Sequence, residues 1–399
     1  MILNHFTDND LYKFTTMNAI QKLYPKAMVK YSFINRGSTI FPEGFAERLR
    51  KEVESMAQLA MSREEEKFIT SKCYYFDPVF IDLLKGYRYD PGEVEIEQNN
   101  DGLIINIEGS WYRTVLWEVP LLALISELYY LMNGIKPKEV ESLALAKALK
   151  MKDLEADYSD FGTRRRFSFD VHDRVIKTLK DNSGVFFKGT SNVYLAMKHD
   201  LFPLRTHPHE WFMYHAAQYG YVLANEMALD AWVDVYKGDL GTALSDTYTT
   251  DNFFASFSTL HAKLFDGIRQ DSGDPLLFTD RAIEFYKKTR TDPRTKTIVY
   301  SDALNIEKIT SIRHYIKGRI HDVYGIGTYL SNDTGIQPLN IVIKMINSKQ
   351  KPSDNYHRTI KLSDDPAKYV GILMKLISAC VFLGFIRTFK EMIAFFCKY

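Results

Sequence analysis

The stretch TKTIVYSDALN, residues 295–305, decides the fold class of this chain, because a β-prone run ends directly in a polar turn and a helical stretch follows it. The same order of strand, turn and helix recurs in six other runs: LEADYSDFGTRRR (154–166), GVFFKGTSN (184–192), LFPLRTHPHEW (201–211), GTALSDTYTTD (241–251), KLFDGIRQDSGD (263–274) and IHDVYGIGTYLS (320–331). Strands that alternate with helices in this way predict a parallel sheet with crossover helices.

These seven units lie between residues 153 and 335. Their number over this length favours an α/β fold built on an irregular, TIM-like α/β barrel. An open, doubly wound sheet is the main alternative. In a parallel barrel, every turn that follows a strand opens onto one rim, where such folds place their chemistry. We therefore expect the polar residues of these turns to share one site.

The N-terminal part predicts a second, mixed α+β domain. Its expected elements are a helix at 8–23, a strand at 27–36, a charged helix at 43–60, a strand-like segment at 102–118 and an apolar helix at 119–134. The predicted domains are the N-terminal domain at 1–130, the barrel with its rim at 131–345, and a C-terminal segment at 346–399 that packs back on the N-terminal domain.

Composition excludes several classes of protein. The 51 lysines and arginines balance 50 aspartates and glutamates, so the net charge of +1 gives no global basic field for a nucleic acid. The N-terminus has no secretory signal pattern. The apolar run at 372–386 contains Lys375 and is too short to span a membrane, which favours a buried helix. Three widely spaced cysteines predict neither a disulfide framework nor a zinc site. We expect a soluble, cytoplasmic protein.

The turn FGTRRR carries three consecutive arginines at a helix start. Guanidinium groups at a helix N-terminus bind carboxylate or phosphate, so one or two of Arg164, Arg165 and Arg166 are candidates for substrate binding. A solvated basic turn is the alternative. Phe161, which opens this turn, can stack on a planar ring or pack in the core.

The turn RQDSGDP, residues 269–275, combines Arg269 with Asp271 and Asp274. Two carboxylates and an arginine in one turn suit a sugar diol or a magnesium-bound pyrophosphate. The alternative is a helix-capping turn with an incidental ion pair.

The turn YGIGTYL contains Gly325, Gly327 and Thr328. Exposed backbone N–H groups in such a turn bind a phosphate monoester, although a glycine pair alone is weak support. The preceding turn YSDAL adds Ser301 and Asp302. Two shorter turns, GTSN and LSDTY, could be no more than helix caps.

The stretch HPHEWF places His207 and His209 one residue apart. A zinc site would need further ligands at recognised spacing, and His215 is the nearest candidate. A helix cap without chemistry is a second interpretation. We favour a rim histidine that acts as nucleophile or base and is oriented by a carboxylate from a neighbouring strand end. No protein-held metal is predicted.

Taken together, these motifs resemble the nicotinate phosphoribosyltransferase family of type II phosphoribosyltransferases. The resemblance runs from DNDLYKFTTMNAI near the N-terminus to KLSDDPAK at 361–368. It implies synthesis of nicotinate mononucleotide from nicotinate and 5-phosphoribosyl 1-diphosphate in NAD salvage, with ATP hydrolysis coupled through a phosphohistidine. It also implies ATP and pyrophosphate-bound Mg²⁺ as cofactors, a homodimer with a shared active site, and classification as a ligase.

The resemblance also implies roles for single residues. His209 matches the phosphorylated histidine and Asp246 the carboxylate that holds its imidazole. Tyr12 and Phe161 match the aromatic pair around the pyridine ring, with Tyr12 donated by the partner subunit. The remaining matches concern the ribose, the phosphates and the pyridine carboxylate: Arg164, Arg269, Asp271, Ser301, Asp302, Gly325, Gly327 and Thr328.

The base is predicted from Ser191 in GTSN, since the related nicotinamide enzyme has an aspartate there. A serine hydroxyl can donate to a carboxylate that an aspartate would repel, so nicotinate is favoured over nicotinamide. A nicotinamide or quinolinate enzyme of the same fold and a catalytically idle relative are the alternatives. After 371 the chain departs from the family pattern with an apolar tail, and nothing catalytic is assigned beyond residue 345.

Overall fold

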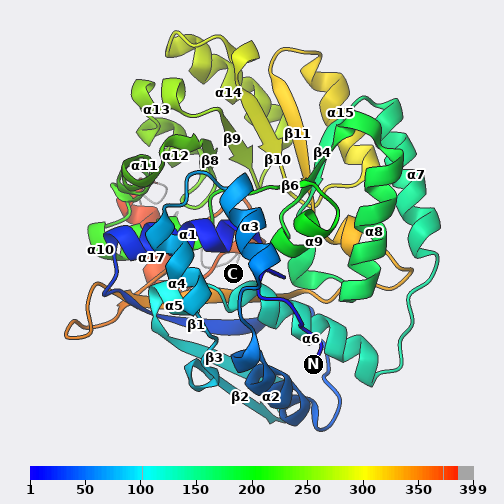
Figure 1. The fold of residues 1–399 in the computed structure, drawn as a ribbon. Coiled ribbons are helices and arrows are strands. Elements are labelled where there is room, and N and C mark those ends of the chain that lie inside the picture. The colour runs from blue at the N-terminus through cyan, green and yellow to red at the C-terminus, as the bar shows by residue number, and fades with distance from the viewer. Residues whose placement is uncertain (101, 372, 385–399) are drawn as a thin grey trace.

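The computed structural model describes residues 1–100, 102–371 and 373–384, and it contains two sheets (Figure 1). The first sheet has seven strands, each of which begins within one of the seven predicted units. In spatial order they are β6 (Phe202–Pro203), β5 (Phe187–Thr190), β4 (Asp157–Asp160), β11 (His321–Ile326), β10 (Thr297–Tyr300), β9 (Gly267–Gln270) and β8 (Thr242–Leu244). Every neighbouring pair is parallel.

The strand order shows which α/β fold this is. From β4 the chain proceeds outward to β5 and β6, and it returns through β8, β9, β10 and β11 to the other side of β4. This is the circular order of a barrel that is open between β6 and β8, so the sheet is a curled half-barrel. The predicted irregular barrel is confirmed, and the doubly wound alternative is excluded.

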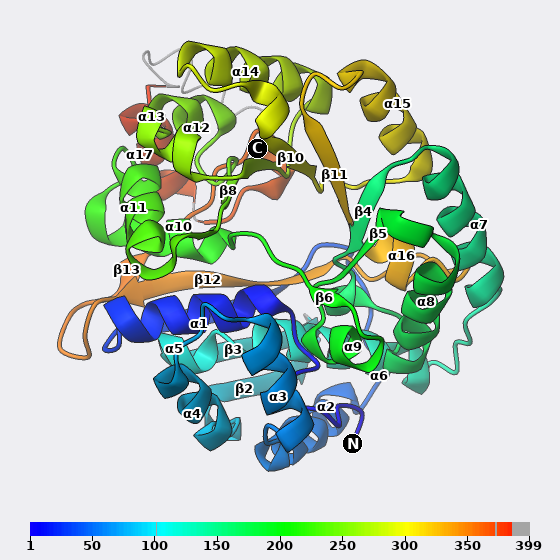
Figure 2. The same ribbon diagram turned by 45° about the horizontal axis from the view of Figure 1, so that its top comes forward.

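Helices cover the outer face of the curled sheet (Figure 2). The helices and the short strand β7 of this part are α7 (Val140–Asp153), α8 (Phe169–Asn182), α9 (Val193–Lys198), α10 (His209–Tyr219), α11 (Ala224–Tyr236), β7 (Lys237–Leu240), α12 (Thr250–Ser256), α13 (Thr259–Leu264), α14 (Pro275–Lys288), α15 (Ile306–Ile316) and α16 (Thr328–Ser331). Fully buried tyrosines pack between the sheet and these helices: the Tyr158 hydroxyl contacts Ser183 at the end of α8, and the Tyr300 hydroxyl contacts Thr279 of α14.

The second sheet is antiparallel and gives the α+β domain its frame. Its order is β13 (His357–Arg358), β12 (Ile341–Lys349), β1 (Met28–Asn35), β3 (Gly102–Ser110) and β2 (Val94–Asn99). The associated helices are α1 (Leu11–Leu23), α2 (Phe45–Ser55), α3 (Arg63–Lys72), α4 (Pro78–Gly86), α5 (Trp111–Thr114) and α6 (Glu118–Met132). β12 crosses the predicted boundary at residue 345 to pair with β1. The three domain ranges themselves stay a prediction.

The expected strand-like segment at 102–118 is correct only in its first half. The strand stops at Ser110, and the next residues turn into α5. The turn brings the Trp111 ring against Trp211 and Tyr214, with centroid distances of 5.9 and 4.2 Å, respectively. Tertiary burial of a large aromatic side chain therefore overrides the local β-propensity.

The apolar run predicted as a buried helix at 372–386 is described only in part. Helix α17 (Leu373–Phe382) covers ten residues of this run, with Leu376, Ile377 and Cys380 buried and Phe382 exposed, and residues 383–384 form a turn. Residues 372 and 385–386 of this prediction lie outside the described residues.

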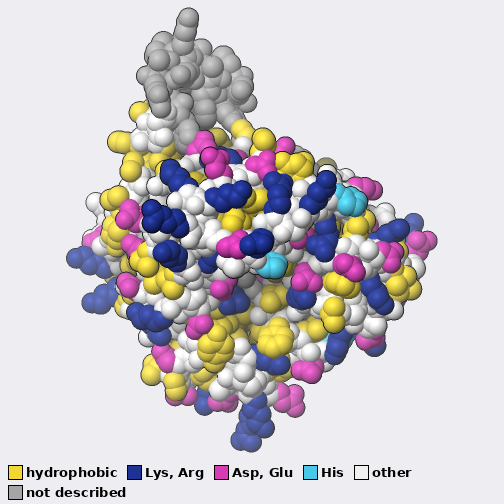
Figure 3. Space-filling model, turned by 90° about the horizontal axis from the view of Figure 1, so that it is seen from above, with side chains coloured by type: hydrophobic (Ala, Val, Ile, Leu, Met, Phe, Trp, Pro, Cys, Tyr) yellow, Lys and Arg dark blue, Asp and Glu magenta, His cyan; other side chains and the backbone are white. Residues whose placement is uncertain are grey.

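One helical stretch, Trp111–Met132, has the length and apolar composition of a membrane span, and 78% of its most apolar window is buried inside the structure. Such burial is typical of a core helix. On the face shown in Figure 3, which lies over α14 and α15, basic side chains are interspersed with acidic ones. This face has the mixed charge expected from a net charge of +1.

Candidate active site

Turns from three strand ends meet at His209, the first residue of α10. Its Nδ1 lies 3.0 Å from the hydroxyl of Thr247, in the turn after β8. Its Nε2 lies 3.1 Å from a carboxylate oxygen of Asp271, in the turn after β9, and 3.0 Å from Nζ of Lys361. With 13% of its side chain exposed, the imidazole contacts a hydroxyl, a carboxylate and an ammonium group at once.

The environment keeps His209 neutral. Burial and the ammonium of Lys361 lower the pKa of His209 to about 4, although Asp246 and Asp271 oppose this shift. The imidazole is therefore uncharged at neutral pH, and one of its ring nitrogens carries a free lone pair. That is the protonation state that a nucleophilic histidine requires.

The expectation that Asp246 holds the imidazole needs correction. The nearest carboxylate oxygen of Asp246 lies 3.8 Å from Nε2, which is too far for a hydrogen bond. Its other oxygen accepts from Ser272 at 2.8 Å and Ser363 at 3.2 Å, and lies 3.3 Å from Nζ of Lys361. Asp246 thus supplies negative charge, while Asp271 and the hydroxyl of Thr247 orient the ring.

Asp271 joins the histidine to an arginine cluster. The guanidinium of Arg269 donates to Asp271 at 2.9 Å, to Ser301 at 2.7 Å and to Thr206 at 2.7 Å. The Ser301 hydroxyl in turn lies 2.7 Å from Asp271. Although burial alone would raise the pKa of Asp271, Arg269 and His209 hold it well below its usual range. The predicted grouping of Arg269, Asp271 and Ser301 is therefore present in one network.

Two lysines of the KLSDDPAK segment complete this network, and both lie beyond residue 345, where the sequence analysis assigned no site residue. Lys361 contacts His209, as described above. Lys368 donates to the backbone carbonyl of Asp271 at 2.6 Å and forms an ion pair with Asp302. The segment reaches the rim because Tyr248 and Leu362 pair through their backbones. The two lysines that flank two adjacent aspartates in this motif were the signal that the sequence analysis left unused.

The arginine triplet divides into two roles. Arg166 is fully buried and forms a bidentate pair with Asp8 at 2.6 and 2.7 Å, so it is structural. Arg164 is 36% exposed and lies 3.4 Å from Glu118. The structure shows no hydrogen bond or ion pair to the guanidinium of Arg165 from any residue it describes. Arg164 and Arg165 are thus the two arginines of the turn that can face an anion.

Unpaired positive charge gathers around these arginines. Burial and the nearby Arg164 and Arg36 lower the pKa of Arg165 to about 10. Burial lowers the pKa of Lys344 to about 8, and Arg164 and Lys361 add to this effect against the attraction of Glu118. Cations that depress one another's pKa in this way indicate a site for a polyanion. None of the sequence motifs predicted Lys344, because it lies within the strand β12.

Tyr12 lies on the same side of the site. Its hydroxyl is 3.3 Å from a carboxylate oxygen of Glu118, the residue that also contacts Arg164. Donation of Tyr12 by a partner subunit stays a prediction. Within the single chain, the Tyr12 hydroxyl and Arg164 already share Glu118.

Ser191 is the first residue after β5, and its hydroxyl donates to the carboxylate of Asp10 at 2.7 Å. Burial raises the pKa of Asp10, although the hydroxyls of Thr163 and Ser191 and the charge of Arg164 oppose the shift. The predicted hydroxyl donor is therefore present at the site, but a carboxylate of the chain holds it in this structure.

Phe161 rests on Gly325, which lies in β11. A Cβ at Gly325 would come within 2.5 Å of the Phe161 ring, so the glycine gives the ring its space. This contact assigns Gly325 a role beneath the ring, in addition to the phosphate role predicted from the sequence. Gly327 and Thr328 follow at the start of α16, and the Phe161 N–H donates to Ile326 at 2.7 Å.

Replacing Gly325 by alanine is expected to push the Phe161 ring out of place. Overpacking of this kind costs about 1–3 kcal/mol of stability. The KM for the pyridine base should rise while KM for the phosphate substrates stays the same, and steady-state kinetics measures both. Gly86→Ala is the matched control, because Gly86, like Gly325, has no positive φ and a Cβ there meets nothing within 4 Å. An unchanged KM for the base would contradict a stacking role of Phe161.

A histidine metal clip is not formed. His207 is buried with both ring nitrogens unpartnered among the described residues, and burial lowers its pKa to about 3. His215 instead contacts the Trp211 carbonyl and the Tyr24 hydroxyl, at 2.7 and 2.9 Å. The His207 ring packs against Trp232 and Phe265, with centroid distances of 4.5 and 5.8 Å, so both histidines have a structural role.

A mixed set of ligands could still take a cation. His209, Asp246 and Asp271 offer ligand atoms within 4.8 Å of one another. Oδ1 of Asp246 is buried with no hydrogen-bond partner among the described residues, so it can accept from a ligand or from a cation's water. The ammonium of Lys361 already supplies positive charge beside these groups. The residues therefore fit Mg²⁺ that arrives with a polyphosphate better than a resident metal.

Comparisons with known proteins agree with this geometry. The sequence model of the nicotinate phosphoribosyltransferase (NAPRTase) family matches residues 156–375, and that of the NAPRTase N-terminal domain matches residues 7–126. Nicotinate phosphoribosyltransferase of Chromohalobacter salexigens is 49% identical over 373 residues, which cover 93% of this chain and 95% of the relative. That of Methanosarcina acetivorans is 40% identical over 93% of this chain and 95% of the relative.

Solved structures give the same result. The crystal structure of nicotinate phosphoribosyltransferase from Porphyromonas gingivalis superposes with a TM-score of 0.94 at 45% identity, covering 96% of this chain and all of that one. The enzyme from Vibrio cholerae superposes with a TM-score of 0.91 at 29% identity, covering 100% of this chain and 98% of that one.

Proposed function

The chain belongs to the nicotinate phosphoribosyltransferase family, and we propose that it couples ATP hydrolysis to the synthesis of nicotinate mononucleotide through a phosphorylated His209. Nicotinate and 5-phosphoribosyl 1-diphosphate are the other substrates, and pyrophosphate, ADP and phosphate are the other products. The observation that carries this proposal is the neutral His209 among Asp271, Lys361 and Thr247 on the rim.

In the first step, a ring nitrogen of His209 attacks the γ-phosphorus of ATP. The N–P bond forms as the bond from phosphorus to the bridging oxygen breaks, and ADP leaves with the electron pair. Lys361 is placed to move from the imidazole onto the phosphoryl oxygens, where negative charge gathers in the transition state. Asp271 and Thr247 keep the ring in position during the transfer. After the mononucleotide has formed, water attacks the phosphorus, the N–P bond breaks with its electron pair returning to the imidazole, and phosphate leaves.

The phosphate groups of both substrates need positive charge. Lys344 and Arg165, with Arg36 nearby, offer cations without strong internal partners. Bound Mg²⁺ would neutralise charge on the pyrophosphate and help it to leave, and Asp302 and Asp246 are the carboxylates that could approach its water shell.

In the second step, the pyridine nitrogen forms a bond to C1 of the ribose as the bond from C1 to pyrophosphate breaks. Charge develops on the ribose ring in an oxocarbenium-like state, and the protein contributes position and electrostatics. We place the ribose and pyrophosphate against Arg269, Asp271 and Ser301, because these three residues form one hydrogen-bonded cluster on the rim. The ring lies between Tyr12 and Phe161, and Arg164 faces its carboxylate.

Preference for the acid over the amide rests on Ser191. Replacing Ser191 by aspartate sets a second carboxylate beside Asp10 and the substrate carboxylate, so kcat/KM for nicotinate should fall at least about tenfold relative to nicotinamide. Ser191→Asn, which adds similar bulk without charge, should change this ratio much less. Competition assays with both bases measure it, and an unchanged ratio in Ser191→Asp would contradict the role given to Ser191.

The experiment that tests the proposed function has two parts. The protein is incubated with ATP and Mg²⁺, and acid-labile phosphate is mapped to a residue by mass spectrometry. 5-Phosphoribosyl 1-diphosphate is then added with nicotinate or nicotinamide, and the mononucleotide is identified by its mass. We expect phosphate on His209 and nicotinate mononucleotide as product. Absence of both would overturn the proposal, and mononucleotide without phosphohistidine would overturn the ATP coupling alone.

The proposal includes a cytoplasmic homodimer with a shared active site, which the family resemblance implies. Sedimentation analysis of the full chain tests the assembly. Mixing a Tyr12→Ala chain with a His209→Asn chain tests the sharing, because recovery of activity in mixed dimers requires the two residues to meet across subunits.

A further inference from the structure

A buried ammonium, Lys13, joins two carboxylates from different parts of the site. Its Nζ lies 2.6 Å from Glu118, and it also forms an ion pair with Glu210. The side chain of Lys13 is 0% exposed, and those of Glu118 and Glu210 are 10% and 8% exposed. A buried ammonium is costly unless it is paired, so both carboxylates are needed to keep this one charged.

Glu210 ties the start of the catalytic helix to the N-terminal domain. It follows His209 directly in the first turn of α10. Besides Lys13 it accepts from the Tyr31 hydroxyl at 2.6 Å and lies 3.5 Å from the indole nitrogen of Trp111. Groups from α1, β1 and α5 therefore fix the position from which His209 projects.

Glu118 lies on the side proposed for the base. It contacts the hydroxyl of Tyr12 at 3.3 Å and the guanidinium of Arg164 at 3.4 Å. Arg164 is proposed to face the carboxylate of the base bound to this chain, whereas Tyr12 is proposed to reach the base site of the partner subunit. Lys13 is thus bonded on one side to the base site and on the other to the helix that carries His209.

The charges make the two sides interdependent. Burial disfavours the charged form of each group, yet Glu118 and Glu210 raise the pKa of Lys13, and Lys13, Lys344 and Arg164 lower the pKa of Glu118 to about 2. One ammonium serves two carboxylates. When the carboxylate of a bound base competes for Arg164, Glu118 loses a partner and attracts Lys13 more strongly. Lys13 then holds Glu210 less firmly.

We propose that Lys13 is a positioning residue that couples occupancy of the base site to the phosphorylation of His209. This inference rests on the proposed function, because it requires both the phosphohistidine and the base site beside Arg164. Its consequence is that ATP is used efficiently only when the base is bound.

The test compares the full-length wild type with Lys13→Met in the presence of ATP, Mg²⁺ and 5-phosphoribosyl 1-diphosphate. ADP formation is measured with and without nicotinate, and the ATP consumed per mononucleotide is determined. In the wild type, nicotinate should change the rate of ADP formation by about fivefold or more, the size of a typical coupling between sites. In Lys13→Met this response should fall below about twofold, and more ATP should be consumed per mononucleotide.

The amount of ATP consumed per mononucleotide distinguishes a loss of coupling from a loss of structure. A residue with only a structural role would slow ADP formation and mononucleotide formation together, which leaves the ratio unchanged. Lys22→Met is the matched control, because Lys22 lies at the other end of α1 and pairs with the 41% exposed Asp77. It should behave like the wild type.

Glu210→Gln keeps the proposal testable if Lys13→Met does not fold. Its amide oxygen can still accept from Lys13 and its NH₂ group can donate to the Tyr31 hydroxyl, while the charge is lost. The response to nicotinate should therefore weaken, and thermal unfolding shows whether the variant is folded. If either folded variant consumes as much ATP per mononucleotide as the wild type does, the inference is overturned. A wild type that forms no mononucleotide or phosphohistidine would instead overturn the proposed function.

Discussion

Replacing Asp271 by asparagine should lower kcat/KM for mononucleotide formation about 10²–10³-fold, as loss of a central electrostatic group in an active site does. Asp271 contacts His209 at 3.1 Å, Arg269 at 2.9 Å and Ser301 at 2.7 Å. An amide has the same shape but carries no charge, and its NH₂ group cannot accept a hydrogen bond. The His209 ring loses its charged partner, and Arg269 loses the carboxylate that directs it to the pyrophosphate.

The neighbouring Asp274 offers a matched control in the same turn. Its carboxylate caps α14 by accepting from the N–H groups of Leu276 and Leu277 at 2.7 and 3.1 Å. Asparagine is an equally good cap, so Asp274→Asn should keep activity within about twofold and cost little stability. Steady-state kinetics and thermal unfolding of both variants measure the difference. Equal activities of the two variants would contradict a catalytic role for Asp271.

The alternation of strands, turns and helices allowed the sequence to predict the barrel, because each parallel strand must be followed by a crossover. It also predicted that His209, Arg269, Asp271 and Ser301 would meet. The reason is geometric: the carboxyl ends of parallel strands face one edge, so residues 209 and 301 become neighbours without any local signal that joins them.

Residues outside the seven units could not be placed by this argument. Lys344 reaches the site from β12 of the second sheet, and Lys361 from the segment that follows β13, so their approach depends on how these parts pack against the rim. The distinct roles of Arg164 and Arg166 depend on Asp8, which is far away in sequence. The orienting partner of His209 was assigned to Asp246 from the family resemblance, and only the distances of 3.8 Å to Asp246 and 3.1 Å to Asp271 show that Asp271 lies nearer.

Replacing Lys361 by methionine should reduce the steady-state level of phosphohistidine about 100-fold or more, a loss typical of an electrostatic group at a transferring phosphoryl. Lys361 lies 3.0 Å from Nε2 of His209 and 3.3 Å from Asp246, and its side chain is 5% exposed. Without its ammonium, the incoming phosphoryl group meets the carboxylates of Asp246 and Asp271 with no positive charge between them. Repulsion then opposes both the binding of ATP and the transfer step.

The same substitution should change the protonation of His209 and the stability of the fold. Lys361 contributes to the lowered pKa of His209, so this pKa should rise toward the ordinary value of 6.5 when the ammonium is removed and the carboxylates remain. Breaking a buried ion pair costs about 3–5 kcal/mol, because Asp246 is left as an uncompensated charge. NMR titration of the His209 ring and denaturant unfolding measure the two effects.

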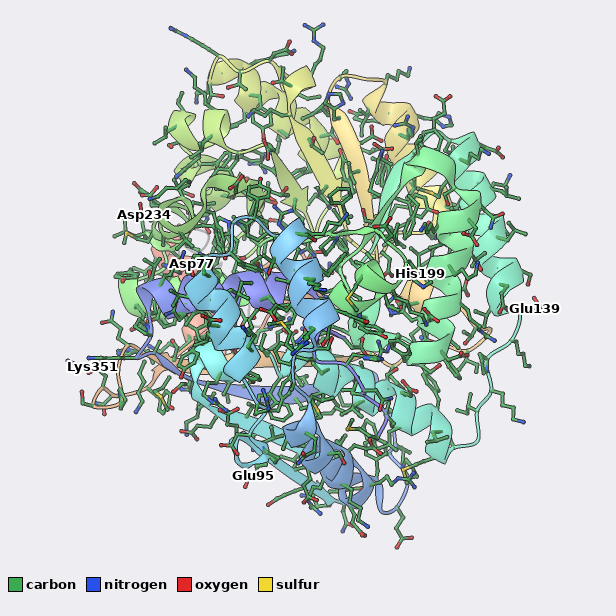
Figure 4. All side chains as sticks on the ribbon, in the orientation of Figure 1. Asp77, Glu95, Glu139, His199, Asp234 and Lys351 are labelled. Carbon is green, nitrogen blue, oxygen red and sulfur yellow. The ribbon has the colours of Figure 1, made fainter. Side chains whose placement is uncertain are left out.

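A double variant distinguishes catalysis from stability in this cluster. Lys361→Met combined with Asp246→Asn removes both charges and should recover much of the lost stability, since no unpaired ion remains. It should not recover phosphorylation, because the cation that faces the phosphoryl group is still absent. The control is Lys351→Met, whose side chain is 61% exposed at the edge of the molecule (Figure 4). Recovery of phosphohistidine in the double variant would show that Lys361 acts through the fold and not on the phosphate.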